Sequence, residues 1–495
     1  MNPTYVRRGI TGAIVGTAWV AGLFVAGPLV GGIGLVAVAQ WIIVRSPGWL
    51  STQAIRLLGF YAQPALVATV LVGTILACGV VAIAWPRLPS GKNAGAIGIG
   101  TVATVALFFE LGAGLSLGFI AGLLVAIALP VLTARAMTTP WATANRRRFL
   151  NRVGSVTVAG VLSIAGLRLL FGRLTGPPES ERVREPLERG VSPPTGDPEF
   201  DFEGMPSAVT PPGEHYVVDI NVTNPIIHPE TWTLDVDGVV ERPYSLSYDE
   251  LLDHDASVEL TTTMICISNV VGGDLIGTGH WTGVALSDLV AAARPTASAV
   301  DVVTHAADGY SEAIPIEIVE REDILIAYGM GDRTLATEHG FPARLLVPGR
   351  YGMKMTKWIT RIEIADRKHE AYWQARGWDE EAVVETMAYV RGAVREGDRV
   401  RVGGVAFAGL ETGVEEISGV EVSVDGGESW NEAELEAQIA AHAWRRWRYE
   451  FDAGGEAEFQ VVARAIESDG TVQTEAESSP RPGGATGWHR VTVTV

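Results

Sequence analysis

The sequence predicts an α-helical transmembrane bundle, followed by a mixed α+β domain and a C-terminal β-sandwich. Three observations support this fold class. Long apolar runs fill the N-terminal region, helical and strand patterns intermix in the middle, and short alternating runs separated by turn signals dominate the end. A chain of 495 residues is long enough for two or three domains.

The N-terminal bundle is predicted from apolar runs, each near the roughly 20 residues that a helix needs to cross a bilayer. The runs cover residues 9–44, 64–85, 94–110, 111–133 and 150–171. Basic residues gather in alternate connections, so the positive-inside rule favours about five crossings. Splitting the first run at Pro28 would instead give six. We therefore expect a multi-pass anchor in the cell membrane at residues 1–173, with the later domains on the extracytoplasmic side.

A basic motif precedes the last apolar run. Residues 145–150 read Asn-Arg-Arg-Arg-Phe-Leu, which resembles a twin-arginine export signal, an address that a receptor reads. A basic cap on a membrane helix explains the same residues. The sequence leaves both interpretations open.

Charge and cysteine content exclude several classes of protein. The chain carries 57 acidic against 38 basic residues, a net charge of −19, which argues against nucleic-acid binding. An acidic chain with so few lysines is typical of halophilic proteins, which are adapted to high salt. The two cysteines, Cys78 and Cys266, lie in segments of different character, so no disulfide framework is expected.

Three segments follow the bundle. Residues 174–213 are rich in proline and charge without apolar periodicity, and they predict a linker. Residues 214–387 form the predicted α+β domain. In residues 388–495, alternating valines and a Gly-Gly turn predict an immunoglobulin-like β-sandwich.

The stretch 261–288 carries the strongest chemical signal. Cys266 ends a Thr-rich, β-branched run that predicts a strand, and Gly272 and Gly273 follow it. A thiolate at the end of a strand, beside conformationally free glycines, suits a soft metal ion. Most lone cysteines, however, are buried packing residues. The residues alone leave both interpretations open.

The spacing around this cysteine resembles a known family. The string C-x-S-N-x-x-G-G-x-x-I-x-x-x-x-W-x-G-V-x-L-x-D-L, which begins at Cys266, is similar to the metal-binding segment of the sulfite oxidase family of molybdopterin enzymes. Nearer the C-terminus, V-E-V-S-V-D-G-G-x-S-W and A-W-x-x-W resemble the dimer-forming domain of that family. The resemblance covers residues 214–475. It implies a sulfite-oxidase-type molybdopterin domain, a Mo-molybdopterin cofactor with Cys266 as metal ligand, and a homodimer, and it leaves molybdenum or tungsten open.

Two further motifs resemble cofactor-binding segments of the same family. They are H-G-x-P-x-R at 339–344 and G-x-x-x-x-K-W at 352–358. A pterin with a phosphate tail needs cationic side chains and backbone donors. The resemblance implies cofactor contacts from His339, Arg344, Met355, Thr356 and Lys357.

The remaining site residues are also assigned by their positions in segments that resemble this family. It implies cofactor contacts from Tyr216, Val217, Asp219, Asn269 and Thr304. The Arg-Asn-His that follows the aromatic segment in typical sulfite oxidases is missing here. The spacing Y-x-x-x-I-P from Tyr310 resembles the segment of the family's active-site tyrosine, whose phenol can hydrogen-bond a substrate oxygen and help a proton move. We therefore expect Cys266 and Tyr310 to be catalytic.

The resemblance implies two-electron oxygen-atom transfer at a Cys-ligated mononuclear molybdenum, on sulfite or a related small oxo substrate. Reduction of an S-oxide or N-oxide, such as methionine sulfoxide, is the alternative. No histidine precedes His215, so the bundle cannot hold a bis-histidine haem. We therefore expect a separate electron-transfer protein, a cytochrome or a membrane haem protein. A sulfite pocket would need several arginines, for which Arg344 and Arg350 are candidates. A metal-free membrane-tethered binding protein and a transporter with a soluble appendage are rival classes.

Overall fold

The chain divides into two compact units. Unit 1 comprises Met1–Glu181 and Ile220–Ile226, and unit 2 comprises Arg182–Asp219 and Ile227–Val495. The computed structural model describes residues 184–187 and 192–495 without 222–223, 321–322 and 411–412, which is most of unit 2 together with residues 220, 221 and 224–226 of unit 1. In the N-terminal region it describes residues 10, 12–23, 39, 42, 62–84, 104–105, 123, 126–127 and 130–131.

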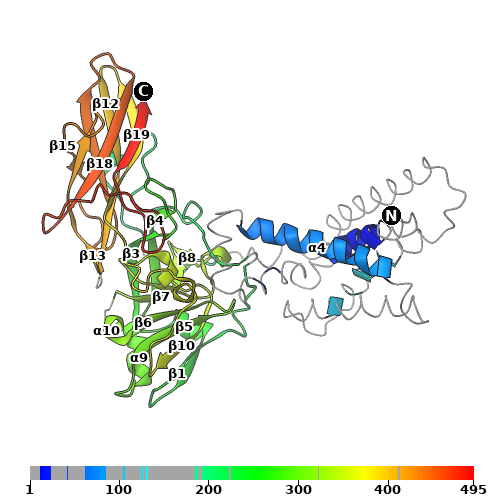
Figure 1. Cartoon of the computed structure of the whole chain (residues 1–495). Coiled ribbons are helices and arrows are strands. Elements are labelled where there is room, and N and C mark those ends of the chain that lie inside the picture. Colours follow the sequence, from blue (N-terminus) through cyan, green and yellow to red (C-terminus); the bar gives the residue numbers. More distant parts are fainter. Residues whose placement is uncertain are drawn as a thin grey trace, which may run out of the picture. The chain divides into compact units, whose positions relative to one another are not determined.

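The described part of unit 1 contains the helix α4 (Ala62–Ala84) (Figure 1). Among the residues that the structure describes, no helix has both the length and the hydropathy that a bilayer crossing requires. The predicted transmembrane bundle is therefore wrong. That prediction rested on apolar composition, which does not determine how far a continuous helix extends. The motif at 145–150 and the run at 150–171 lie outside the described residues, as do most of the runs at 94–110 and 111–133.

The first sheet of unit 2 mixes parallel and antiparallel neighbours. Its strands, in spatial order, are β2 (Tyr244–Ser247), β1 (Thr233–Gly238), β10 (Ile359–Ala365), β5 (Asp301–Ala306) and β6 (Ser311–Pro315). β1 and β10 are parallel, and the other neighbours are antiparallel. The parallel pair joins strands far apart in the sequence, so this sheet closes only after most of the domain has been synthesised.

The second sheet is antiparallel and contains the strand that leads to Cys266. Its strands are β3 (Ser257–Ile265), β4 (Ile276–Ala285), β7 (Leu325–Met330) and β8 (Arg333–Thr334), with β9 (Arg344–Leu346) paired to β7. The domain also has the short helices α8 (Tyr248–Leu252), α9 (Leu286–Ala293) and α10 (Ile316–Val319), and the 3-10 turns η5 (Thr337–His339), η6 (Gly352–Lys354) and η7 (Gln374–Arg376). The region is thus richer in strands than the mixed pattern suggested.

Strand β4 lies at the centre of this domain. All of its residues are buried, because both faces of the strand are covered. Trp281 on β4 is fully buried in a core that also contains Ile326 and Ile359. At Gly283 a Cβ atom would come 2.3 Å from the carbonyl oxygen of Ile326, so a glycine is needed for the close approach of β4 and β7.

The C-terminal part of unit 2 is a two-sheet β-sandwich (Figure 1). One sheet contains β11 (Met387–Glu396), β12 (Arg399–Leu410), β17 (Arg445–Asp452) and β16 (Glu434–Leu435), with β13 (Gly413–Glu415) paired to β12. The other contains β15 (Asn431–Glu432), β14 (Ile417–Ser423), β18 (Glu458–Glu467) and β19 (His489–Thr494). Val420 and Val422 are fully buried between the sheets, as their alternation predicted. Gly426 and Gly427 turn the chain with positive φ angles of 83° and 105°.

A separate apolar cluster holds the end of β3 against the sandwich. Ile265 and Ile267 flank Cys266 and pack with Tyr389, Phe407 and Trp444. The backbone N–H of Trp444 also donates to Thr263 Oγ1 at 2.7 Å. The sandwich therefore fixes the position of the cysteine from one side.

The proline-rich segment carries more structure than its composition suggested. Its described residues include the 3-10 turn η4 (Pro198–Phe200), and Phe200 and Ala208 are buried. Trp444 Nε1 donates to the carbonyl oxygen of Ala208 at 3.0 Å. A segment without apolar periodicity can still lie along a folded surface when partner side chains satisfy its carbonyl groups. The domain boundaries predicted from the sequence stay predictions.

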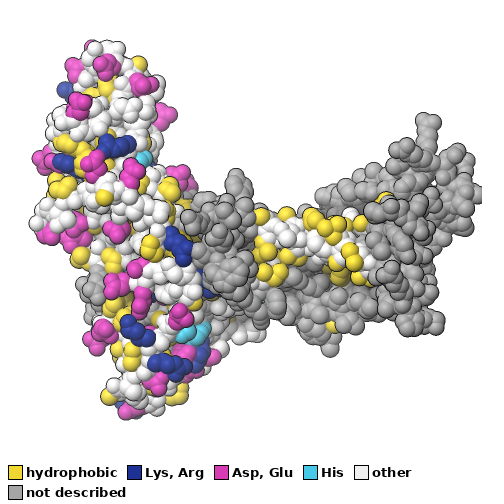
Figure 2. Space-filling view, viewed as in Figure 1, with side chains coloured by type: hydrophobic (Ala, Val, Ile, Leu, Met, Phe, Trp, Pro, Cys, Tyr) yellow, Lys and Arg dark blue, Asp and Glu magenta, His cyan; other side chains and the backbone are white. Residues whose placement is uncertain are grey.

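Acidic side chains are scattered over the face of unit 2 that Figure 2 shows, and basic ones lie among them. Many of them pair locally, as Arg361 does with Asp237 and Glu363. Such an interspersed surface keeps the acidic chain solvated.

Candidate functional site

Cys266 lies directly after β3, at the start of a tight loop. Its backbone N–H donates to the carbonyl oxygen of Leu275 at 3.0 Å, which closes the loop across its base. The Sγ atom lies 3.0 Å from Ser268 Oγ. Burial raises the pKa of the thiol, and hydrogen bonds from Ser268 oppose this in part. A buried thiol of this kind becomes a thiolate only when a positive charge, such as a metal ion, stabilises it.

The loop of residues 266–275 is held by its own side chains and by the sandwich. Asn269 Oδ1 accepts the N–H of Leu275 at 3.1 Å, and its Nδ2 donates to the carbonyl oxygen of Gly273 at 3.3 Å. Arg391 on β11 donates to the carbonyl oxygens of Gly272 and Gly273 at 3.0 and 2.6 Å. The amide of Asn269 is thus used inside the loop, where it positions the cysteine. Its direct contact with a cofactor stays a prediction.

Four buried polar atoms near this loop have no hydrogen-bond partner among the described residues. They are His215 Nε2, Tyr216 Oη, Trp281 Nε1 and Arg344 Nε. The His215 ring centre lies 5.2 Å from that of Tyr216 and 5.9 Å from that of Trp281. Leaving each such atom unsatisfied costs roughly 1–3 kcal/mol, and native proteins keep few of them. A cluster of four fits a polar ligand that supplies the missing partners.

Arg344, the first residue of β9, is a buried cation with no carboxylate partner among the described residues. Its Nη1 donates to the carbonyl oxygen of His339 at 3.2 Å. Burial lowers the pKa of the guanidinium to about 10, and the nearby phenol of Tyr216 opposes this. The side chain therefore stays charged at neutral pH. A buried, unpaired guanidinium is suited to bind an anionic group such as a phosphate.

The predicted residues His339, Lys357 and Asp219 come together beside Arg344. Lys357 Nζ lies 3.1 Å from Asp219 Oδ2 and 3.0 Å from the carbonyl oxygen of Glu338. His339 Nε2 lies 2.9 Å from the carbonyl oxygen of Pro212, and burial lowers the pKa of its imidazole to about 4. The structure thus joins the segments 216–219, 339–344 and 352–358, which the sequence could only place separately.

Three other predicted residues have different surroundings. Thr304 Oγ1 and Thr356 Oγ1 lie 2.7 Å apart, and both threonines are buried. One hydroxyl group therefore donates to the other, and Thr304 Oγ1 also lies 3.4 Å from the carbonyl oxygen of Glu312, to which it can donate. Met355 is buried beside them, whereas the side chain of Val217 is 44% exposed.

Tyr310 is buried in a polar network that the sequence did not reveal. Its hydroxyl donates to the carbonyl oxygen of Met353 and, at 3.3 Å, to Glu312 Oε2. Glu312 is fully buried and pairs with Lys354 at 2.7 Å. Burial raises the pKa of the Tyr310 phenol well above its usual range, so the phenol remains a proton donor. Glu312 stands two residues after Tyr310 in a strand-forming stretch, a spacing that places both on one face and could have suggested the contact.

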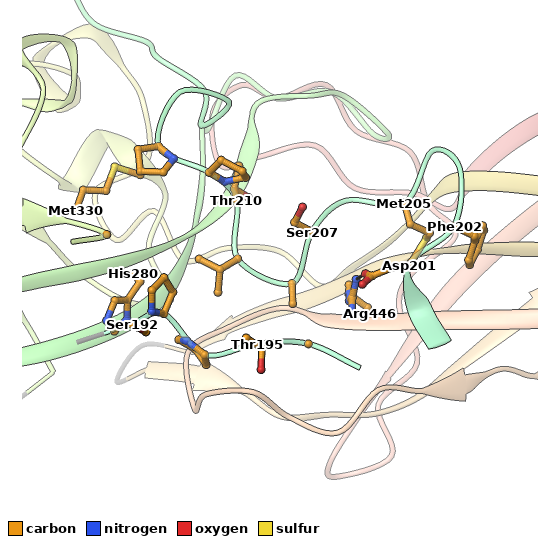
Figure 3. A pocket seen from close by; sticks show the side chains of 18 of the residues that line it. Ser192, Thr195, Asp201, Phe202, Met205, Ser207, Thr210, His280, Met330 and Arg446 are labelled. Carbon is orange, nitrogen blue, oxygen red and sulfur yellow. Dashed lines mark hydrogen bonds and ion pairs between the residues drawn. The ribbon is translucent and has the colours of Figure 1, made fainter. Parts of the chain in front are cut away.

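A cavity in the described part of the chain lies apart from these residues. It measures about 920 Å³ and is lined by parts of residues 192–212 together with His280, Met330, Gly331 and Arg446 (Figure 3). None of the predicted site residues lines it. Arg446 in its wall is already paired with Asp201 and Glu436. The cavity is therefore distinct from the site around Cys266.

Comparison with protein families matches both domains of unit 2. Residues 221–373 match the oxidoreductase molybdopterin binding domain, and residues 382–495 match the Mo-co oxidoreductase dimerisation domain. These two domains define a molybdopterin oxidoreductase.

Individual relatives identify the type. Mitochondrial sulfite oxidase of Mus musculus is 29% identical over 328 residues, which cover 55% of this chain and 59% of that protein. Sulfite oxidase of Gallus gallus is 27% identical over 332 residues, which cover 56% and 72%. The NAD(P)H nitrate reductase of Hordeum vulgare is 27% identical over 286 residues, which cover 46% and 32%. The chain thus carries molybdopterin oxidoreductase domains of the sulfite oxidase type, and the cofactor of these domains is Mo-molybdopterin.

A solved structure shows the same fold. The sulfane dehydrogenase SoxCD from Paracoccus pantotrophus matches with a TM-score of 0.51 and 22% identity, over 63% of this chain and 90% of that chain. The chain matches only about 59% of the length of the mammalian sulfite oxidases. The relatives therefore establish the type of domain, while activity and partners need their own argument.

Proposed function

We propose that the chain transfers an oxygen atom to or from a small oxo substrate, with Mo-molybdopterin held at Cys266. The observation that carries this proposal is the buried cluster around the cysteine. It combines a buried thiol, four polar atoms without partners among the described residues, and the unpaired cation Arg344. Together these groups fit an anionic, polar cofactor that brings a metal to the sulfur atom.

Each residue of the cluster has a role that its surroundings support. Cys266 would ligate the metal as a thiolate, because ligation offsets the burial that raises its pKa. Arg344 would bind an anionic part of the cofactor, and the Lys357–Asp219 pair would border it. The phenol of Tyr216, whose pKa burial raises well above its usual range, would donate a hydrogen bond. When bound, the cofactor supplies the two-electron redox change of oxygen-atom transfer.

Tyr310 would act on the substrate side of the site. Its phenol remains protonated, and Glu312 and the carbonyl oxygen of Met353 orient it. It can therefore hold or pass a proton at the oxygen atom that is exchanged. The proposal extends to a homodimer formed through the C-terminal domain and to a separate one-electron carrier, such as a cytochrome. An extracytoplasmic position of the catalytic domain also stays a proposal.

The test compares the two cysteines after expression in a host that makes the cofactor. The wild type should contain stoichiometric molybdenum or tungsten and show thiolate-to-metal charge-transfer absorption. Cys266→Ser should lose that absorption and the turnover of oxo substrates with artificial electron donors and acceptors. Cys78→Ser is the matched control and should keep both. Equal turnover in wild type and Cys266→Ser would refute the ligand assignment, and a wild type without either metal would favour a binding protein.

A further inference from the structure

The sulfur atom of Cys266 is hydrogen-bonded within its own loop. Its Sγ lies 3.0 Å from Ser268 Oγ, and the backbone N–H of Ser268 also acts on the sulfur. Among the residues that the structure describes, no other side chain hydrogen-bonds this Sγ, and the Ser268 hydroxyl has no second partner. The hydroxyl and the sulfur are therefore committed to each other.

Metal binding would fix the direction of this hydrogen bond. In the free thiol, either the sulfur or the hydroxyl oxygen can be the donor. A cysteine ligates a metal as a thiolate, which has no proton to donate. The hydroxyl of Ser268 would then be the donor and the sulfur of Cys266 the acceptor.

The apolar surroundings of the sulfur give weight to a single donor. Cys266 is buried, and its neighbours Ile265 and Ile267 belong to an apolar cluster that also contains Phe407. Burial raises the pKa of the thiol, whereas the two hydrogen bonds from Ser268 lower it. A hydrogen bond is electrostatically stronger in such a medium than in water. Loss of the hydroxyl should therefore change the electron density on the sulfur more than loss of a surface contact would.

Contacts from the sandwich hold the loop that carries Ser268. The hydroxyl of Tyr389 on β11 donates to the carbonyl oxygen of Val270 at 3.4 Å. The ring of His489 on β19 lies so close to Gly272 that a Cβ atom there would come 2.1 Å from its Nε2. The loop thus has little freedom to carry the hydroxyl away from the sulfur. Outer contacts of this kind orient the ligands of a metal and tune its properties.

We propose that Ser268 is a positioning residue, which donates a hydrogen bond to the Cys266 thiolate and thereby raises the reduction potential of the bound metal. This inference rests on the proposed function and deepens it at the ligand sulfur. A hydrogen bond withdraws electron density from the sulfur, so the sulfur donates less charge to the metal. The reduced state of the metal, which carries more electrons, is then favoured over the oxidised state. Hydrogen bonds to ligating cysteines tune reduction potentials in copper and iron–sulfur sites in this way.

The test is a redox titration of the molybdenum-loaded protein, in which the EPR signal of the singly reduced metal is followed. Ser268→Ala removes the hydroxyl and keeps the backbone N–H. At a given applied potential we expect the ratio of reduced to oxidised metal to fall roughly tenfold. For a one-electron step this is a shift of about 59 mV to lower potential. The sulfur-to-metal charge-transfer band should move to longer wavelength, because the sulfur electrons are held less tightly.

Two further variants show whether the hydroxyl is responsible. Ser268→Thr keeps a hydroxyl and should retain the wild-type potential and band. Ser418→Ala is the matched control, because its hydroxyl donates to the carbonyl oxygens of Ile466 and Glu467 on the sandwich, and it should change neither. Metal content and thermal unfolding should stay as in the wild type in all three variants. A merely structural role of Ser268 would change these two quantities and leave the potential in place.

An unchanged potential in Ser268→Ala with full metal content would overturn the inference and leave the proposed function standing. An equal fall in Ser268→Ala and Ser268→Thr would also overturn it, because the hydroxyl would then be irrelevant. Should Ser268→Ala not load the cofactor, resonance Raman spectroscopy of the wild type decides. Its metal–sulfur vibration should shift promptly in D₂O, since a hydroxyl proton exchanges faster than a backbone amide proton, and the absence of a shift would refute the hydrogen bond. A wild type without metal would contradict the proposed function itself.

Discussion

The guanidinium carbon of Arg344 lies 5.1 Å from the centre of the Trp281 ring. Both side chains are buried, and each has a nitrogen without a hydrogen-bond partner among the described residues. The aromatic face stabilises the cation in part, but a ring is a weak substitute for a carboxylate. The protein therefore keeps an uncompensated positive charge at the place where an anionic cofactor is proposed to bind.

Arg344→Met should affect the cofactor-free and the loaded protein in opposite directions. Methionine removes an uncompensated buried charge, so the free energy of unfolding of the cofactor-free chain should stay constant or rise by about 1–2 kcal/mol. The loaded protein should lose stability relative to the loaded wild type, because stabilisation by a ligand grows with the logarithm of its affinity for the folded state and the variant binds the cofactor more weakly. Denaturant unfolding with and without cofactor measures both effects.

Arg361→Met is the control for this substitution. Arg361 is partly exposed and pairs with Asp237 and Glu363, so its loss should cost less than about 1 kcal/mol. The difference in stability between loaded and free protein should not change. If Arg344→Met destabilised the cofactor-free chain by several kcal/mol, Arg344 would be an ordinary structural residue.

Two buried histidines should make the cofactor-free protein less stable at acid pH. Burial lowers the pKa of His215 to about 3 and that of His339 to about 4, from the ordinary value of 6.5. Below pH 6.5 these histidines are protonated in the unfolded chain but not in the folded one. The free energy of unfolding therefore falls as the pH is lowered from 6.5 towards the folded-state pKa values. Each histidine contributes a slope of about 1.4 kcal/mol per pH unit until its folded-state pKa is reached.

Urea unfolding at pH values from 7.5 to 4.5 measures this slope. Glutamine does not titrate in this range. His215→Gln should therefore reduce the slope of the free energy of unfolding against pH by the contribution of one proton, about 1.4 kcal/mol per pH unit. An unchanged slope in His215→Gln would show that the ring is reached by water in solution.

The sequence could locate the cysteine but not the charges around it. The motif that begins at Cys266 runs through one loop, strand β4 and the start of helix α9, so its spacing is readable along the chain. The Glu312–Lys354 contact joins residues 42 positions apart, and it depends on how β6 and η6 meet in space. The isolation of Arg344 depends on burial against Trp281. No one-dimensional pattern contains such information.

Two predictions failed or fell short because they rested on composition alone. Apolar runs suggested a transmembrane bundle, which the described helices do not support. Proline and charge suggested a solvated linker, yet Phe200 is buried and Ala208 is bonded to Trp444. By contrast, the alternation of Val420 and Val422 with Glu421 matches their burial in β14, because a half-buried strand imposes a period of two residues. Ser423, expected on the polar face, is buried as well.

Gly352→Ala should disturb the site with little effect on the fold. The added Cβ would lie 2.9 Å from Tyr216 Oη, and this phenol must move, which is easy because no described residue holds its hydroxyl. We expect a loss of stability below about 1 kcal/mol and a several-fold lower molybdenum content. Gly213→Ala meets no atom within 4 Å and should change neither. Full metal content in Gly352→Ala would place the cofactor away from Tyr216.

Arg446→Met should release the segment of residues 197–206 from the sandwich. The guanidinium is fully buried and binds both oxygens of Glu436 at 2.7 Å, Asp201 at 2.5 Å, and the carbonyl oxygen of Asp197 at 3.0 Å. Its removal leaves the buried Glu436 carboxylate without its cation, which costs roughly 3–5 kcal/mol. Urea unfolding should show this loss, and limited proteolysis should show faster cleavage within the segment.

The double variant Arg446→Met/Glu436→Met separates the cost of the unpaired charge from the value of the contact. When both charges are replaced by apolar side chains, the desolvation penalty of the remaining carboxylate disappears. Most of the lost unfolding free energy should therefore return, although the N–H of Asp197 loses its acceptor on Glu436. Cleavage of the segment should stay faster than in the wild type, because the hydrogen bonds to Asp201 and Asp197 are still missing. A double variant as unstable as Arg446→Met would mean that these hydrogen bonds, and not the ion pair, hold the segment in place.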